Sequence, residues 1–155
     1  MTPLNIRYIS IEGNTRSFVS HLAEYADKQH EENADKPTLK VEEISEQSDF
    51  IDETEPYFAF VPTYLDGGNG IDNGVKELMT NVLGEYIAYH DNRKQCLGVI
   101  GSGNRNFNEQ YCLTARRYAD KYGFPFLADY ELRGTTRDIT RIYDLIVKTA
   151  IQADK

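Results

Sequence analysis

Residues 57–61 read Tyr57-Phe58-Ala59-Phe60-Val61 and run directly into Pro62-Thr63-Tyr64-Leu65-Asp66-Gly67-Gly68-Asn69-Gly70. A strand that is apolar at every residue is typical of the middle of a parallel sheet, where both faces are covered. The following stretch, 62–74, is rich in glycine without apolar periodicity, which predicts a long loop. Residues 96–100 (CLGVI) and the Gly/Asn-rich stretch 101–108 repeat this pattern. The two pairs together predict the interior of an α/β sheet with polar loops at one edge.

Less apolar strands and amphipathic helices flank these two strands. Further strands are predicted at 4–11, 38–44 and 126–132. Helical spacing predicts helices at 15–30, at 75–89, at about 111–122, and from Gly134-Thr135 onward with Ile139, Ile142, Ile146 and Ala150 on the core face. The acidic stretch 45–55 predicts at most a short helical turn, so one crossover helix is nearly missing. Alternating strands and helices predict a single α/β domain over residues 1–155, a five-stranded parallel sheet with helices on both faces.

The overall charge and the two cysteines narrow the function classes. The chain has 155 residues and a net charge of −8, which disfavours nucleic acid and anionic membranes as partners. No apolar run approaches the roughly 20 residues of a membrane helix. Cys96 and Cys112 lack the spacing of a disulfide framework or a metal site. The N-terminus has no signal-peptide pattern, so we expect a cytoplasmic protein.

The first candidate loop, Ser10-Ile11-Glu12-Gly13-Asn14-Thr15, joins a predicted strand to a predicted helix. A helix N-terminus offers free N–H groups and a partial positive charge, which favour a phosphate. Ser10, Asn14 and Thr15 add side-chain donors, and Gly13 permits a tight turn. The phosphate motifs Gly-x-x-x-x-Gly-Lys and Gly-x-Gly-x-x-Gly are both absent, which favours a monophosphate. An ordinary capping turn is the alternative interpretation.

The loops after the two buried strands favour a flat heterocycle. Glycines around Asn69 allow the backbone to lie close to a ring, and Tyr64 offers an aromatic face for stacking. The amides of Asn104 and Asn106 suit the polar rim of a heterocycle, and Phe107 could cover it. Parallel strands bring these loops to one edge of the sheet. A phosphate site beside a ring site predicts flavin mononucleotide (FMN), with plain surface loops as the alternative.

Four stretches of the chain resemble the NrdI family of flavodoxin-like proteins, and the similarity covers nearly the whole chain. Ser-x-x-Gly-Asn-Thr at 10–15 is similar to a flavodoxin phosphate loop. Pro62-Thr63-Tyr64 with Gly67-Gly68 resembles the NrdI loop that faces the flavin. Residues 98–107 (GVIGSGNRNF) are the most specific match, and residues 130–135 (YELRGT) resemble the segment after the last strand. The long middle loop and the 31–56 region resemble the streptococcal-type branch.

This resemblance implies a fold, a cofactor, a partner and a reaction. The fold would be a flavodoxin-like three-layer sandwich with strand order 2-1-3-4-5. Reduced FMN would pass one electron to O2, and the superoxide would activate the dimanganese-tyrosyl radical cofactor of the class Ib ribonucleotide reductase small subunit. An unidentified reductant would supply electrons to the flavin, and no side chain would act as a catalytic acid or base. The alternatives are a general flavodoxin electron carrier and a flavin-free interaction module of the same fold.

The predicted cofactor-binding residues come from the three loops and the helix start after the third. They are Ser10, Ile11, Glu12, Gly13, Asn14, Thr15, Pro62, Thr63, Tyr64, Gly67, Gly68, Asn69, Gly70, Ser102, Gly103, Asn104, Asn106, Phe107, Tyr111 and Cys112. No metal ligands are predicted.

Overall fold

A computed structural model describes residues 1–10, 13–63, 65–67, 75–77, 82–104 and 112–154. Its central sheet has five parallel strands in the order β2-β1-β3-β6-β7. The strands are β1 (Leu4–Tyr8), β2 (Leu39–Glu43), β3 (Tyr57–Pro62), β6 (Cys96–Gly103) and β7 (Phe126–Glu131). The predicted parallel sheet and its 2-1-3-4-5 order are confirmed.

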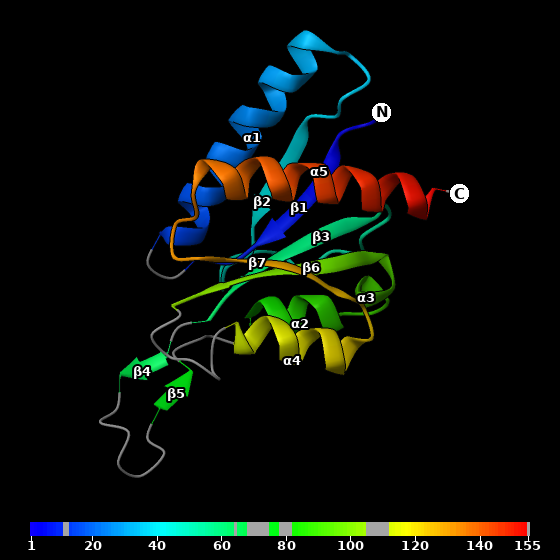
Figure 1. Ribbon diagram of the computed structural model, residues 1–155. Coiled ribbons are helices and arrows are strands. Elements are labelled where there is room, and N and C mark those ends of the chain that lie inside the picture. The colour runs from blue at the N-terminus through cyan, green and yellow to red at the C-terminus, as the bar shows by residue number, and fades with distance from the viewer. Residues whose placement is uncertain (11–12, 64, 68–74, 78–81, 105–111, 155) are drawn as a thin grey trace.

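Helices cover both faces of the sheet and complete three layers (Figure 1). Helices α1 (Asn14–Glu32) and α5 (Thr136–Ala153) lie on one face. Helices α2 (Val82–Ala88), α3 (Asn92–Gln95) and α4 (Leu113–Tyr122) lie on the other. Each face has its own apolar cluster, which contains Phe18 and Ile142 on the first face and Leu83 and Ala115 on the second. Two separate cores explain why the central strand β3 is buried at all six residues.

Two predictions around the long middle loop were wrong. Strand β4 (Leu65–Gly67) pairs antiparallel with β5 (Val75–Glu77) in a second, two-stranded sheet, where we expected a loop and the start of a helix. Strand pairing satisfies backbone N–H and C=O groups outside the main sheet, which a helix start at 75 would not do for 65–67. The described helix begins only at Val82, and residues 68–74 and 78–81 lie outside the described part of the chain.

The bounds of two strands of the main sheet also differ from prediction. Strand β6 continues through Gly101-Ser102-Gly103, which we had placed in a loop, because Gly101 and Ser102 pair with both β3 and β7 and Gly103 pairs with β7. Their small size permits it, since a Cβ on Gly101 would lie 2.8 Å from the Cβ of Ala115 in α4. Strand β1 ends at Tyr8, three residues earlier than predicted. The four-residue helix α3 was not predicted.

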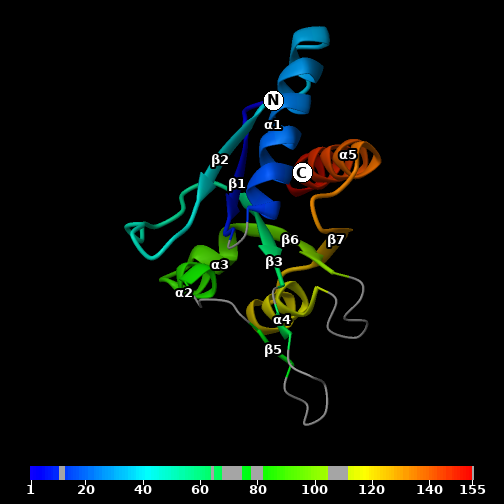
Figure 2. The same ribbon diagram turned by 90° about the vertical axis from the view of Figure 1, so that its left-hand side faces the viewer.

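The nearly missing crossover helix between β2 and β3 is confirmed, because residues 44–56 contain none. A hydrogen-bonded segment covers the sheet there instead (Figure 2). The Arg7 Nε donates to Oε2 of Glu53 at 2.7 Å and its Nη2 to Oε1 at 3.2 Å. The Tyr86 hydroxyl donates to the same carboxylate at 2.6 Å. Asn92 accepts the Glu53 N–H through Oδ1 and donates to the Ile51 carbonyl. We call Arg7, Glu53, Tyr86 and Asn92 the Arg7 network.

None of the described helices is both long and apolar enough to cross a membrane.

Candidate functional site

The carboxyl ends of β1, β3 and β6 lie side by side at one edge of the sheet, which Figure 2 shows end-on. From β1 the chain moves outward to β2, and β3 then takes the place on the other side of β1. Open α/β sheets bind ligands beyond the carboxyl ends of the strands, at the point where the strand order reverses in this way. The structure therefore brings together the described ends of the three predicted loops.

The first loop closes on itself around a serine hydroxyl. The Ser10 Oγ accepts hydrogen bonds from the backbone N–H groups of Gly13 at 3.1 Å and Arg16 at 3.3 Å. Gly13 has φ of +90°, and no atom lies within 4 Å of the place where its Cβ would be. Gly13 thus makes a tight left-handed turn at the helix N-terminus, with open space beside it.

Thr15 carries the clearest sign of a ligand. Its side chain is fully buried in the first turn of α1, yet its Oγ1 has no hydrogen-bond partner among the described residues. A buried hydroxyl without a partner costs about 1–3 kcal/mol, so such groups are uncommon unless a ligand or water completes them. The helix N-terminus beside it favours an anion. The residues at this turn fit a phosphate.

Asn14 and Arg16, which flank Thr15, both have partners. The Asn14 Oδ1 accepts a hydrogen bond from Arg133 Nε at 3.2 Å. Arg16 forms two hydrogen bonds to the Glu43 carboxylate, at 2.9 and 3.0 Å. The Arg16 charge is therefore compensated by Glu43 of β2, and the Asn14 amide is held by Arg133, from the turn between β7 and α5.

The second and third loops are joined at their first residues. The Thr63 N–H donates to the Ser102 carbonyl at 2.9 Å, and Pro62 pairs with Ser102 across the sheet. The Thr63 Oγ1 accepts the N–H of Thr114 at 2.9 Å, in the first turn of α4. Thr63 and Ser102 are both buried, and Asn104 follows β6 half-buried. Thr63 therefore braces α4 in addition to lying at the predicted ring site.

Some of the remaining predicted residues lie in the described part of the chain, and the others do not. Gly67 ends β4, and Gly103 ends β6, where its carbonyl accepts the N–H of Leu132 at 2.9 Å. The others lie outside the described residues: Ile11, Glu12, Tyr64, Gly68, Asn69, Gly70, Asn106, Phe107 and Tyr111.

The chain was compared with known families, proteins and structures. A family model described as NrdI flavodoxin-like matches residues 6–144. An NrdI-like protein of Streptococcus pyogenes serotype M18 is 50% identical over 147 residues, covering 95% of this chain and 94% of that protein. Protein NrdI of Bartonella tribocorum is 40% identical over 137 residues, covering 88% and 87% of the two chains. The chain belongs to the NrdI family.

Solved structures similar in fold to this NrdI-family chain include flavodoxins. A short-chain flavodoxin associated with a bacterial microcompartment has a TM-score of 0.68 at 18% identity, with both chains fully covered. A flavodoxin variant of Fusobacterium nucleatum, bound to flavin mononucleotide, has a TM-score of 0.59 at 15% identity and covers 97% of this chain and 96% of its own. These similarities confirm the flavodoxin-like fold. The streptococcal relatives agree with the predicted branch of the NrdI family.

Residues after β7 were missing from the predicted site. Leu132 and Arg133 reach Gly103 and Asn14, one in each of two site loops. Both lie in 130–135, a stretch that resembles NrdI proteins, but nothing in their spacing links them to either loop. Only the fold, in which β7 lies beside β6 and leads into α5 next to α1, brings them there.

The two cysteines are free and buried. Burial raises the pKa of the Cys96 thiol to about 12, so the group stays protonated and unreactive near neutral pH, as its place in a buried strand suggested. Cys112 precedes α4 with φ of 56°, at the end of the third loop. Its small side chain lies under Gly101 of β6.

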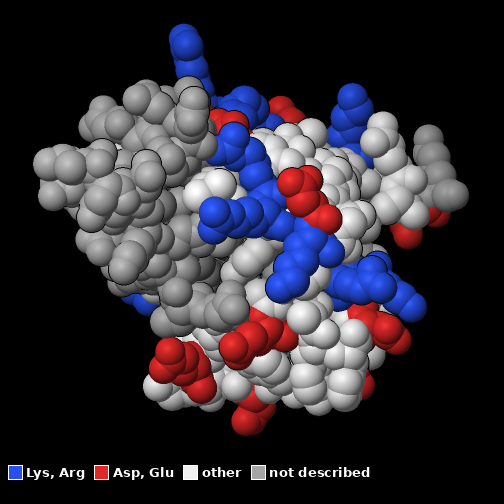
Figure 3. All heavy atoms as spheres, turned by 90° about the horizontal axis from the view of Figure 1, so that it is seen from below, with Lys and Arg blue, Asp and Glu red and all other residues white. Residues whose placement is uncertain are grey.

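Charge is unevenly spread over this NrdI-family protein. Figure 3 views the face of α2 and α4, where Lys and Arg side chains gather beside residues that are not described. On this side of the sheet the exposed basic residues are Arg93 and Lys94 of α3 and Arg116, Arg117 and Lys121 of α4. The net charge of −8 therefore does not describe this face.

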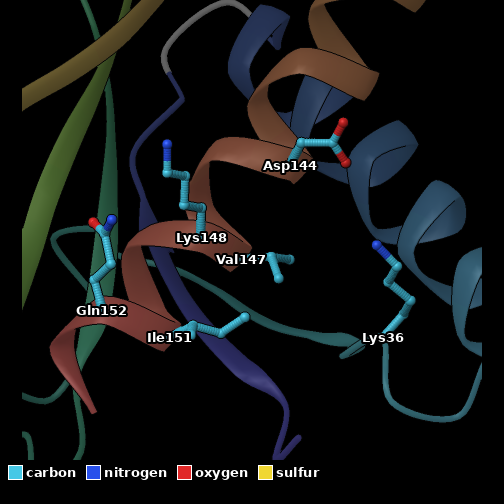
Figure 4. A pocket seen from close by; sticks show the side chains of 6 residues that line it. All are labelled: Lys36, Asp144, Val147, Lys148, Ile151 and Gln152. Atoms are coloured by element: carbon cyan, nitrogen blue, oxygen red, sulfur yellow. The ribbon is translucent and has the colours of Figure 1, made fainter. Parts of the chain in front are cut away.

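One hollow lies away from the site, between α5 and the turn that leads to β2 (Figure 4). Lys36, Asp144 and Lys148 line it together with Val147, Ile151 and Gln152. Its charged groups are of both signs, and the described residues place no unpartnered buried polar atom there. Nothing in its chemistry selects a ligand.

Proposed function

We propose that residues 1–155 form a single FMN-binding domain that serves class Ib ribonucleotide reductase. The phosphate would bind at the N-terminus of α1, held by Ser10, Gly13, Asn14 and Thr15. The isoalloxazine ring would lie along the loops after β3 and β6. This assignment extends to the residues of those loops that lie outside the described part of the chain.

The observation that carries the proposal is the Thr15 hydroxyl, which is buried at the N-terminus of α1 without a hydrogen-bond partner among the described residues. A phosphate oxygen would accept from this hydroxyl and from the backbone of the first turn. Gly13 leaves open space on the same side. The phosphate requires no metal ion here, because the helix N-terminus and the Asn14 amide supply the donors.

When bound and reduced, FMN supplies one electron to O2, and the superoxide so formed would oxidise the dimanganese site of the reductase small subunit, which then generates its tyrosyl radical. The protein's own contribution is to bind the phosphate, to orient the ring at the sheet edge and to restrict water around it. A separate, unidentified reductant would reduce the flavin again after each electron transfer. The reductase small subunit is then the partner, in the cytoplasm, and O2 is the co-substrate.

Membership of the NrdI family favours this role over that of a general flavodoxin. The chain is 40–50% identical to proteins named NrdI or NrdI-like, and only 15–18% identical to the flavodoxins of similar fold. The fold alone supports FMN binding equally well for both roles. Sequence similarity is therefore what selects the reductase as partner.

The test is radical formation in a class Ib small subunit from the same genome. The chain is loaded with FMN, reduced, and mixed with the subunit, Mn(II) and O2, and the tyrosyl radical is measured by electron paramagnetic resonance. We expect a radical with this protein and none with free reduced FMN or an FMN-loaded flavodoxin. A radical yield no higher than with free reduced FMN would contradict the proposed role. A purified protein without flavin absorbance near about 450 nm, even after added FMN, would contradict the cofactor.

A further inference from the structure

The turn between β7 and α5, residues 131–135, contacts both halves of the site. The Leu132 N–H donates to the carbonyl of Gly103, which ends β6. The Arg133 Nε donates to the Asn14 Oδ1 in the first turn of α1. One short segment therefore links the loop that would face the flavin ring to the loop that would hold the phosphate.

Packing fixes this turn against α1. Gly134 has φ of +73°, and a Cβ there would lie 2.6 Å from Cδ2 of Phe18. Phe18 is fully buried in α1 and stacks on Tyr130 of β7, with ring centroids 3.8 Å apart and planes at 14°. The turn cannot move toward or away from α1 without disturbing this stack, so Arg133 extends from a fixed base.

The start of α5 holds the other end of the turn. Thr135 and Asp138 form a capping box, in which each side chain bonds the other residue's backbone N–H. The Arg141 Nη2 donates to Oδ1 of Asp138 and to the Asp129 carbonyl. The backbone on both sides of Arg133 is therefore anchored by groups that do not depend on the phosphate loop.

The contact between Arg133 and Asn14 sets which end of the amide is available. A guanidinium only donates hydrogen bonds, so the amide must turn its oxygen to Arg133. The Asn14 NH2 group, which only donates, is then left for an acceptor such as a phosphate oxygen. Without Arg133 the amide could present either its oxygen or its nitrogen, and the oxygen would repel an anion.

We propose that Arg133 is a positioning residue, which acts through Asn14 to make the α1 turn selective for the phosphate of its ligand. This inference rests on the proposed FMN site and adds to it a residue outside the three loops. Arg16, the other arginine near the turn, is already paired with Glu43, whereas the Asn14 amide that Arg133 holds is neutral.

The test compares FMN with riboflavin, which has the same ring and no phosphate. Dissociation constants are measured by flavin fluorescence for the wild type, Arg133→Ala, Asn14→Ala and the double variant. We expect Arg133→Ala to weaken FMN binding by about tenfold and to leave riboflavin binding unchanged. Asn14→Ala should weaken FMN by a similar factor, and the double variant by no more than Asn14→Ala alone. Arg137→Ala, which removes one exposed positive charge from the next turn of α5, should bind FMN like the wild type.

Each outcome decides a separate point. Equal FMN affinity of Arg133→Ala and the wild type would overturn the positioning role while leaving the FMN site intact. A double variant about 100-fold weaker, the product of the two single losses, would also overturn it, because Arg133 would then act independently of Asn14. A wild type that binds no FMN would overturn this inference together with the proposed function. Urea unfolding of each variant verifies that the fold is retained.

Discussion

Two buried polar regions of this protein differ in one respect. In the Arg7 network, Arg7, Glu53, Tyr86 and Asn92 all find partners within the chain. At the α1 turn, the Thr15 hydroxyl is equally buried and finds none among the described residues. Folding accounts for the first region, because satisfied polar groups replace a missing helix. The described residues supply no partner for the second, and a bound phosphate would provide one.

The Arg7 network also shifts the pKa values of two of its members. Although burial lowers the pKa of Arg7, the hydrogen bond and charge of Glu53 raise it overall. Burial and then the bond to Glu53 raise the pKa of Tyr86. The Arg7 guanidinium and the Tyr86 hydroxyl therefore both keep their protons across the physiological range.

The largest expected effect comes from breaking the network. Glu53→Ala removes the carboxylate that is hydrogen-bonded to the buried Arg7 guanidinium and leaves it only the half-exposed Glu42 carboxylate at 3.8 Å, so the free energy of unfolding should fall by about 3–5 kcal/mol in urea titrations. The double variant Arg7→Met with Glu53→Leu removes both charges and should recover most of this loss. If Glu53→Ala unfolds at the wild-type urea concentration, the network does not hold the 44–56 segment.

A smaller loss is expected where the β7–α5 turn packs on α1. Gly134→Ala combines φ of +73° with a Cβ contact at 2.6 Å to Phe18, and should cost about 2–3 kcal/mol. Gly123→Ala is the matched control, because Gly123 has φ of +84° and no atom within 4 Å of the added Cβ. It should cost only about 1 kcal/mol by thermal unfolding. Equal losses in the two variants would show that the Phe18 contact is unimportant.

Removing the unpartnered hydroxyl should separate binding from stability. Thr15→Val should leave the free energy of unfolding of the FMN-free protein unchanged or raise it by up to about 1 kcal/mol, since no bond is lost. FMN affinity should fall by about tenfold, measured by quenching of flavin fluorescence. Thr149→Val, in α5 away from the site, should not alter FMN affinity. A clear loss of stability with unchanged affinity in Thr15→Val would assign the hydroxyl a structural role.

The smallest expected effect is at the surface cap of α5. Burial raises the pKa of Asp138, but the hydrogen bonds from Arg141 and Thr135 outweigh it, so the pKa lies below its ordinary value. The carboxylate therefore adds stability above the unfolded pKa of about 3.9, and this is lost as pH falls through the lower folded value. Asp138→Asn should lower stability by roughly a few tenths of a kcal/mol at pH 7 and by nothing near pH 2. A difference that persists at pH 2 would exclude the charge as its cause.

The sheet was predictable because its signal is local. The strand at 57–61 and the helix with Ile142 and Ile146 on its core face are both confirmed. Each was predicted from the spacing of apolar residues alone. The β4–β5 pair was not predictable, since its strands have only three residues each and pair with each other in a sheet of their own. The extension of β6 through Gly101-Ser102-Gly103 depends on close approach by α4, which no local pattern encodes.

The candidate site was predictable where one loop supplies it. Ser10, Gly13 and Thr15 are neighbours in sequence, and their geometry fits the phosphate turn that their order predicted. Arg133 is 119 residues from Asn14, so its role depends on the fold that brings β7 and α5 beside α1. The brace from Thr63 to α4 was missed for the same reason.

The central claim is that the α1 turn recognises a phosphate. Isothermal titration of the flavin-free protein with FMN and then with riboflavin tests it most directly. We predict one FMN site per chain and riboflavin binding at least about 100-fold weaker, because riboflavin leaves the Thr15 hydroxyl and the helix N–H groups without an acceptor. Equal affinities for the two flavins, or no heat with either, would contradict the account.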